Sequence, residues 1–240
     1  MSNRRFLILH GVENWRPRSH WQWWLADQLR NQGEHVLYPQ LPSPTSPALD
    51  EWLLVLRGEL SQLGDGERIV VAHSCGVALW LLGAPEIAAE QETVDRVALI
   101  APPGPSAFTA PYRAFLPVGI CWADVAQASK QLPILVTSDN DPYCPEGLDA
   151  YKATYTEPLG LDHQIVPGAG HISIGEGYGP WPAILDWCLN GAAEWTQPAN
   201  AASVGQLTGR IERIVEQSAD RALARGVGTC SVRAAAPRTR

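Results

Sequence analysis

The sequence lacks the features that mark several specialised classes of protein. Its five cysteines form no CxxC pair, so a structural zinc site is not expected. No apolar run reaches the roughly 20 residues that a membrane-spanning helix needs. The N-terminus also lacks the apolar core and the cleavage site of a signal peptide. We therefore expect a cytoplasmic protein with reduced thiols, without a metal ion and without a membrane partner.

Positive charge is scarce outside the C-terminal end of the chain. The formal net charge is −7, which argues against nucleic acid as a partner because phosphate binding needs clustered Lys and Arg. Residues 203–240 hold seven arginines and three acidic residues. We expect residues 1–195 to form one domain and residues 196–240 an extension, with a helix at about 205–225 and disorder beyond it. A protein partner for this basic helix is left open, although no other feature supports one.

Short apolar segments alternate with amphipathic ones along the chain. Apolar runs predict strands at residues 5–9, 35–38, 68–72, 94–100, 132–137 and 164–166. Helical spacing predicts helices at residues 19–31, with Ser19 as N-cap, and at 49–63, 75–82 and 181–189. This alternation favours an α/β fold with a doubly wound, mostly parallel sheet of about six strands and helices on both faces.

The segment between the fourth and fifth predicted strands departs from this alternation. Residues 104–130 contain three prolines and one predicted helix, at about 123–130. A segment of this length forms a small cap at most. We therefore expect a site with a minimal lid.

The third predicted strand leads into a sharp turn with a serine at its tip. The residues Ala72-His73-Ser74-Cys75-Gly76 match a nucleophile elbow between strand and helix, with alanine in place of the first glycine. The residues two positions from the serine must be small because strand and helix approach closely there. The turn presents the Ser74 hydroxyl as a nucleophile near a helix N-terminus, where the helix dipole favours an anion.

A serine hydroxyl is a weak nucleophile without a base, and in this pattern the acid and the histidine follow the serine in that order. His171 lies in a glycine-rich loop after the last predicted strand, and we predict it as the general base. Asp139 and Asp141 compete for the acid after the fifth strand. We favour Asp141 as the residue that orients the imidazole, and Asp139 as a cap of the turn. His73 and His163 are expected to be structural.

Two backbone N–H groups are predicted to stabilise the oxyanion of a tetrahedral intermediate. One belongs to Cys75, and the other to Val12, because Gly11 frees the loop after the first strand to turn its backbone inward. Cys75 is itself an alternative nucleophile, which the elbow disfavours because it points Ser74 to the surface. Candidates for the substrate pocket are His10, Gly11, Trp15, Trp21 and Trp181.

Six short blocks together resemble a known family. They are Leu9-His10-Gly11, His20-Trp21-Gln22-x-Trp24-Leu25, Ala72-His73-Ser74-Cys75-Gly76, Ser138-x-x-Asp141-Pro142-Tyr143, Gly170-His171 and Gly177-Tyr178-Gly179-Pro180-Trp181-Pro182. Over residues 5–190 the chain resembles the YdeN / retinoblastoma-binding protein nine family of small serine α/β-hydrolases. The resemblance implies the α/β-hydrolase fold with little or no lid, a Ser–His–Asp triad, and hydrolysis of small carboxylic esters, with peptide or amide cleavage in some members. Ile172-Ser173 after the histidine departs from the family's usual residues, and the tail lies outside the resemblance.

These features predict a serine hydrolase that cleaves a small-molecule ester through an acyl-enzyme and needs no cofactor. Bulky tryptophans near the site favour short or aromatic acyl groups. An aminopeptidase or amidase with the same triad is the first alternative, disfavoured because the sequence offers no cluster of carboxylates for a free amine. A partner-binding protein on the hydrolase scaffold is the second, and deletion of residues 203–240 would test it.

Overall fold

A single parallel sheet runs through the centre of the protein. The computed structural model describes residues 3–199, so the helix predicted at about 205–225 lies outside the described residues. The strands are β1 (Arg4–Leu9), β2 (His35–Leu37), β3 (Glu67–His73), β4 (Arg96–Ile100), β5 (Ile134–Thr137) and β6 (Asp162–Ile165). Their order is β2-β1-β3-β4-β5-β6, and every neighbouring pair is parallel.

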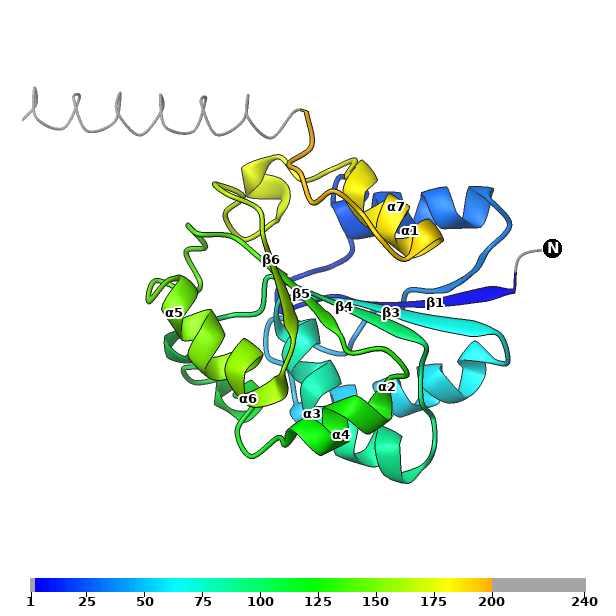
Figure 1. The fold of residues 1–240 in the computed structure, drawn as a ribbon, viewed down its shortest axis with the longest axis horizontal. Coiled ribbons are helices and arrows are strands. Elements are labelled where there is room, and N and C mark those ends of the chain that lie inside the picture. The colour runs from blue at the N-terminus through cyan, green and yellow to red at the C-terminus, as the bar shows by residue number, and fades with distance from the viewer. Residues whose placement is uncertain (1–2, 200–240) are drawn as a thin grey trace, which may run out of the picture.

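Helices cover both faces of this sheet, as a parallel sheet requires (Figure 1). One face carries α1 (Trp21–Asn31) and α7 (Pro182–Asn190), and the other carries α2 (Leu49–Leu63), α3 (Cys75–Ala89) and α4 (Trp122–Ala128). Between β5 and β6 the chain forms α5 (Leu148–Tyr151), a π-helical turn (Lys152–Thr156) and α6 (Glu157–Leu159). Short 3-10 turns lie at Pro105–Ala107, Tyr112–Phe115 and Ile174–Glu176. The predicted doubly wound α/β architecture is confirmed.

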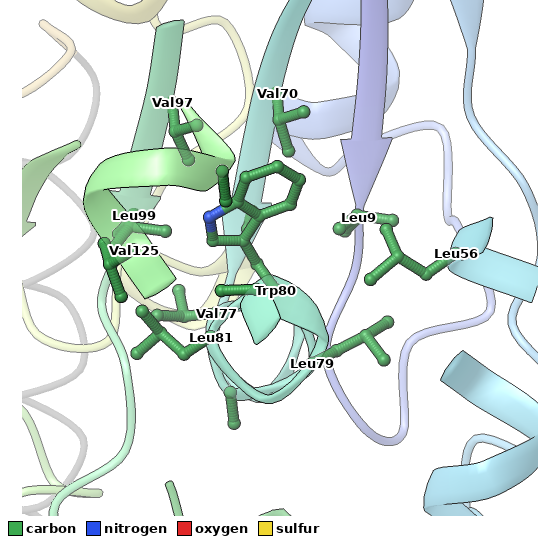
Figure 2. Close-up of a cluster of buried hydrophobic side chains, with 14 of the residues drawn as sticks. Leu9, Leu56, Val70, Val77, Leu79, Trp80, Leu81, Val97, Leu99 and Val125 are labelled. Atoms are coloured by element: carbon green, nitrogen blue, oxygen red, sulfur yellow. The ribbon is translucent and has the colours of Figure 1, made fainter. Parts of the chain in front are cut away.

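The core consists of two apolar layers separated by the sheet. Alternate residues of β1 point to opposite faces, so Phe6 and Ile8 join the layer under α1 and α7 while Leu7 and Leu9 join the other. In the second layer the fully buried Trp80 of α3 lies among aliphatic side chains of the sheet and helices, including Val70 (Figure 2). Both layers hold the strands rigidly, and the loops at the carboxyl ends of the strands are built on this support.

The winding of the chain reverses at β1. This strand has β2 on one side and β3 on the other, so the loops after β1 and β3 lead to helices on opposite faces. A crevice forms at the carboxyl ends of the strands where such a reversal occurs, and ligands bind there in open α/β sheets. Gly11 follows β1 and Ser74 follows β3, so the fold places both at this crevice.

Several predicted boundaries are corrected by the structure. Helix α1 begins at Trp21, and its N-cap is His20 rather than Ser19 because the His20 ring accepts a hydrogen bond from the Gln22 N–H. Helix α3 continues past the predicted end at residue 82 to Ala89, and the added turns still bury Gly83, Ala84 and Ile87. The helical segment 148–159 was not predicted.

Candidate active site

The Ser74 turn has the strained backbone that a nucleophile elbow requires. Ser74 adopts φ 56° and ψ −128°, a conformation that side-chain-bearing residues rarely adopt. Its N–H donates to the Ile100 carbonyl at 3.0 Å, which ties the turn to β4. A Cβ on Gly76 would lie 2.7 Å from the Leu9 carbonyl oxygen. Only glycine therefore lets α3 start this close to β1, which explains the small residue after the serine.

The loop after β1 packs directly on the elbow through Gly11. A Cβ on Gly11 would lie 2.6 Å from the Ser74 Cβ, 2.9 Å from its Oγ and 3.3 Å from the Cys75 nitrogen. Burial raises the pKa of the Cys75 thiol to about 12, partly offset by a hydrogen bond from the Val12 backbone. The thiol is therefore protonated at neutral pH, which disfavours Cys75 as a nucleophile. The close approach of Gly11 to the Cys75 nitrogen brings the loop that carries Val12 against the start of α3, where the two predicted oxyanion donors lie.

Ser74, His171 and Asp141 form a continuous chain of hydrogen bonds. The Ser74 hydroxyl lies 2.9 Å from Nε2 of His171. Nδ1 of His171 lies 2.8 Å from Oδ2 of Asp141 and 3.1 Å from Oδ1. The buried carboxylate also accepts hydrogen bonds from the Tyr143 N–H at 2.8 Å and the Tyr151 hydroxyl at 3.0 Å. These two partners hold the Asp141 carboxylate toward the imidazole, so the ring presents Nε2 to the serine.

The competing carboxylate, Asp139, has a different contact. Its Oδ1 accepts a hydrogen bond from the Gly168 N–H at 2.7 Å, and the neighbouring Asn140 accepts one from the Gly170 N–H at 2.8 Å. Both contacts hold the loop that leads to the histidine. The geometry thus brings Asp141 to His171 and leaves Asp139 as a loop anchor.

Two further side chains fix the loop that carries the histidine. His73 donates from Nε2 to the His171 carbonyl at 3.0 Å, and Trp21 donates from its indole to the Ile172 carbonyl at 2.8 Å. Burial, followed by the neighbouring His171 charge, lowers the pKa of His73 well below its usual value. His73 is therefore a neutral donor with a structural role. His163 lies away from the site, with Nε2 2.7 Å from the Thr137 hydroxyl.

A cavity of about 780 Å³ opens above the nucleophile. Its floor contains Ser74, His171 and Gly11, and its walls come from the loop after β1, the 104–115 segment and the loops that carry the acid and the histidine. Most of the large lining side chains are apolar or aromatic: Val12, Trp15, Phe108, Tyr112, Tyr143 and Ile174. Glu13 is the one formally charged side chain among the lining residues, apart from the histidines. The cavity suits an uncharged, partly apolar substrate.

The five predicted pocket residues divide into two groups. Gly11 and Trp15 line the cavity. His10, Trp21 and Trp181 are fully buried and lie outside its lining, so their assignment to the pocket is corrected. His10 accepts the Leu41 N–H at 2.9 Å and donates to the Gly11 carbonyl at 2.7 Å, and the Trp181 indole donates to the Thr196 carbonyl at 2.8 Å.

Sequence reasoning missed three features of the site. Tyr151 supports the acid from a helix that was not predicted. The 104–130 segment was expected as a small cap, but Phe108 and Tyr112, which line the cavity from it, were not singled out. His20 also lines the cavity, and its position in the block His20-Trp21-Gln22 was the signal that could have revealed it.

Within residues 3–199, no group of three or more His, Cys, Asp or Glu side chains is arranged to hold a metal ion. No helix of that same region is long and apolar enough to cross a membrane.

Comparison with known proteins identifies the family. The family model described as serine hydrolase matches residues 6–189. The chain belongs to this family. No curated protein matches the chain. The family and the α/β-hydrolase fold that the sequence motifs predicted are both confirmed.

Solved structures resemble this serine hydrolase in fold. The YdeN gene product of B. subtilis is 21% identical, with a TM-score of 0.61 over 77% of this chain and 96% of that one. A putative YdeN-like hydrolase of Pectobacterium atrosepticum is 22% identical, with a TM-score of 0.56 over 78% and 90%. Est1E of Butyrivibrio proteoclasticus is 16% identical, with a TM-score of 0.52 over 71% and 80%.

Proposed function

We propose that this serine hydrolase cleaves small carboxylic esters with Ser74 as nucleophile, His171 as general base and Asp141 as the acid that orients the base. The observation that carries the proposal is the hydrogen-bond chain from the Ser74 hydroxyl through His171 to the Asp141 carboxylate at the floor of an open cavity. Nucleophile, base and orienting group stand in the order and at the distances that acyl transfer needs.

In the acylation step, Ser74 Oγ attacks the ester carbonyl while His171 Nε2 takes the hydroxyl proton. The carbonyl oxygen becomes an oxyanion, and the Cys75 and Val12 N–H groups stabilise it. His171 then passes its proton to the leaving alcohol, and the acyl group stays on Ser74. Asp141 stabilises the imidazolium without taking the proton.

In the deacylation step, water enters the cavity and attacks the acyl-enzyme. His171 removes a proton from the water and returns it to Ser74 Oγ, which releases the carboxylic acid. The open cavity gives water this access, and no residue of the cycle is consumed.

One observation favours an amide or peptide substrate as a second candidate. Glu13, the charged residue of the cavity wall, accepts a hydrogen bond from the Tyr112 hydroxyl at 3.3 Å and is exposed to solvent. A carboxylate at this place attracts a substrate amine. Hydrolysis of an aminoacyl p-nitroanilide that falls on Glu13→Gln substitution, with ester hydrolysis unchanged, would support this candidate.

The ester proposal is tested with p-nitrophenyl acetate and butyrate. We expect turnover by the wild-type protein and its loss in Ser74→Ala, with Ser19→Ala, on the surface before α1, as a matched control of full activity. Equal slow background hydrolysis by all three proteins would contradict the proposal.

A further inference from the structure

The block His20-Trp21-Gln22 is not used by the proposed triad. Two of its side chains form hydrogen bonds to backbone carbonyls. The Trp21 indole donates to the Ile172 carbonyl, and the Gln22 amide donates to the Leu9 carbonyl at 2.9 Å. Both contacts stabilise loops that end at the site. His20 differs because it is 4% exposed and yet lines the cavity.

The cap of α1 determines where His20 carries its proton. Nδ1 accepts the Gln22 N–H at 3.2 Å, so the neutral ring bears its proton on Nε2. Burial, followed by the nearby His171 charge, lowers the pKa of His20 to about 3. The ring is therefore neutral at physiological pH. Nε2 is an uncharged hydrogen-bond donor.

The Nε2 donor of His20 has no hydrogen-bond partner among residues 3–199. It is not among the fully buried polar atoms that lack a partner, so Nε2 keeps some accessible surface on a side chain that lines the cavity. The ring cannot turn away, because it packs against Trp21 at 5.6 Å and against His73 at 5.4 Å between ring centroids. A fixed donor of this kind is stabilised when a ligand supplies an acceptor.

The residues that line the cavity around His20 limit which kind of acceptor group a ligand can place there. Among residues 3–199, no lysine or arginine lines the cavity, and a neutral donor gives a carboxylate little compensation for its lost hydration. An ether or hydroxyl oxygen needs only one such hydrogen bond. The His73 ring lies between His20 and the proposed base, because its centroid is 5.4 Å from that of His20 and 5.1 Å from that of His171.

We propose that His20 is a positioning residue that donates from Nε2 to an ether or hydroxyl oxygen of the substrate near the scissile ester. The site then prefers oxygen-bearing esters over alkyl esters of equal size. The proposal rests on the proposed function for the reaction and adds the substrate class.

Two ester pairs of matched size test the preference. The first pair, p-nitrophenyl methoxyacetate and p-nitrophenyl butyrate, differs by an ether oxygen in the acyl group. The second pair, 2-methoxyethyl butyrate and butyl butyrate, differs by an ether oxygen in the alcohol. The quantity measured is the ratio of kcat/KM within each pair. Differences in intrinsic reactivity cancel when this ratio is compared between variants.

Two substitutions separate the role of His20 as a hydrogen-bond donor to the substrate from its role as the N-cap of α1. His20→Asn retains an acceptor close to the Nδ1 position and removes the donor, whereas His20→Gln places an amide N–H near the Nε2 position and loses the cap. We expect the preference for the ether-bearing ester to fall about three- to tenfold in His20→Asn in at least one pair, and to recover in part in His20→Gln. His35→Asn, at the amino end of β2 and therefore on the opposite edge of the sheet from the site, is the matched control with an unchanged ratio.

Unchanged ratios in both pairs for His20→Asn, or an equal fall in both His20 variants, would overturn the proposal. The same pairs bound to the Ser74→Ala protein, measured by calorimetry, give a ratio that does not depend on turnover. Ser74-dependent hydrolysis of p-nitrophenyl butyrate with unchanged ratios would reject the role of His20 alone. Absent hydrolysis would reject the proposed function, and the binding ratios would still test His20.

Discussion

At the scale of single residues, the site depends on glycines that let backbone segments meet. Gly11 brings the loop after β1 against Ser74, and Gly76 brings α3 against the end of β1. Both contacts leave no room for a side chain. Close backbone contacts therefore place Ser74 and the proposed oxyanion donors. A side chain added at either glycine would push these segments apart and strain the site.

Gly11→Ala tests this placement. The added Cβ would meet the Ser74 Cβ at 2.6 Å, so the elbow or the loop must move. We expect kcat/KM for p-nitrophenyl butyrate to fall about 100-fold, with a loss of about 1–3 kcal/mol in the free energy of unfolding. Gly58→Ala, on α2 with nothing within 4 Å of the new Cβ, should keep full activity and gain about 0.5–1 kcal/mol. Full activity in Gly11→Ala would contradict the account.

Asp141→Asn and Asp139→Asn form a matched pair on one turn. An amide at residue 141 no longer fixes the His171 tautomer, so we expect kcat to fall about 10⁴-fold. Asp139→Asn weakens one loop hydrogen bond, to the Gly168 N–H, and should cost a few-fold at most. Steady-state kinetics of both proteins decides between them, and a larger loss in Asp139→Asn would reverse the assignment of the acid.

The sequence placed both aspartates after the fifth strand and favoured Asp141, which the structure brings to 2.8 Å from Nδ1 of His171. What separates them in the structure is burial and the Tyr151 hydroxyl, which comes from a helical segment that the sequence did not predict. The large apolar residues of the segment 148–159 recur at helical spacing, as Leu148, Tyr151, Tyr155 and Leu159, so the sequence held a signal for this helical segment that was missed. Long-range partners of this kind appear only once the fold is known.

At the scale of elements, a buried arginine of β4 helps to hold α7 to the sheet. Arg96 of β4 donates to the Trp187 carbonyl at 2.8 Å and to the Cys188 carbonyl at 3.0 Å, near the end of the helix. Its guanidinium also lies 5.1 Å from the centre of the Trp187 ring and pairs with Glu67. A cation at a helix C-terminus satisfies carbonyls that have no partner within the helix.

Arg96→Met should therefore lower stability without affecting catalysis. The buried Cys188 carbonyl loses its donor, whereas the Trp187 carbonyl keeps the Gly191 N–H at 2.8 Å. We expect the free energy of unfolding to fall by about 1–3 kcal/mol in urea titrations. kcat per folded molecule should be unchanged. Arg57→Met, which removes exposed ion pairs to Glu86 and Glu90, is the matched control and should cost less than about 1 kcal/mol. Equal stability of both variants would show that Arg96 does not hold α7.

Elements differ in how well the sequence predicts them, and burial explains the difference. The strands of the sheet centre, such as β3 and β4, are continuous apolar runs because both of their faces are covered. Strand β6 is at the edge, reads Asp-His-Gln-Ile and buries none of its residues fully, so its position was predicted two residues too late. The sequence did not predict the order of the strands in the sheet either, since that order depends on which strands pair across the molecule.

At the scale of the whole molecule, three buried histidines couple stability to pH. Burial lowers the pKa of His10 to about 4, that of His20 to about 3, and that of His73 well below its usual value. In the unfolded chain each would bind a proton near pH 6.5. The unfolded state therefore takes up protons as the pH falls below 6.5, while the folded state does not. The contribution of these three histidines to the free energy of unfolding is therefore complete above pH 6.5 and is lost toward pH 4.

We expect the free energy of unfolding to fall by about 4–6 kcal/mol between pH 7.5 and pH 5. Urea titrations at intermediate pH values measure this loss. His20→Asn removes one of the three titrating groups, so its loss over the same range should be smaller by about a third. A stability that stays constant down to pH 5 would show that these histidines titrate alike in both states.

The central claim is that Ser74 is the acylated nucleophile, and covalent labelling tests it most directly. A fluorophosphonate probe reacts with an activated serine, and mass spectrometry of the digested protein locates the adduct. The account predicts a single adduct on Ser74, absent after Ser74→Ala and much slower after His171→Ala. An adduct on another residue, or none at all on a folded protein, would contradict it.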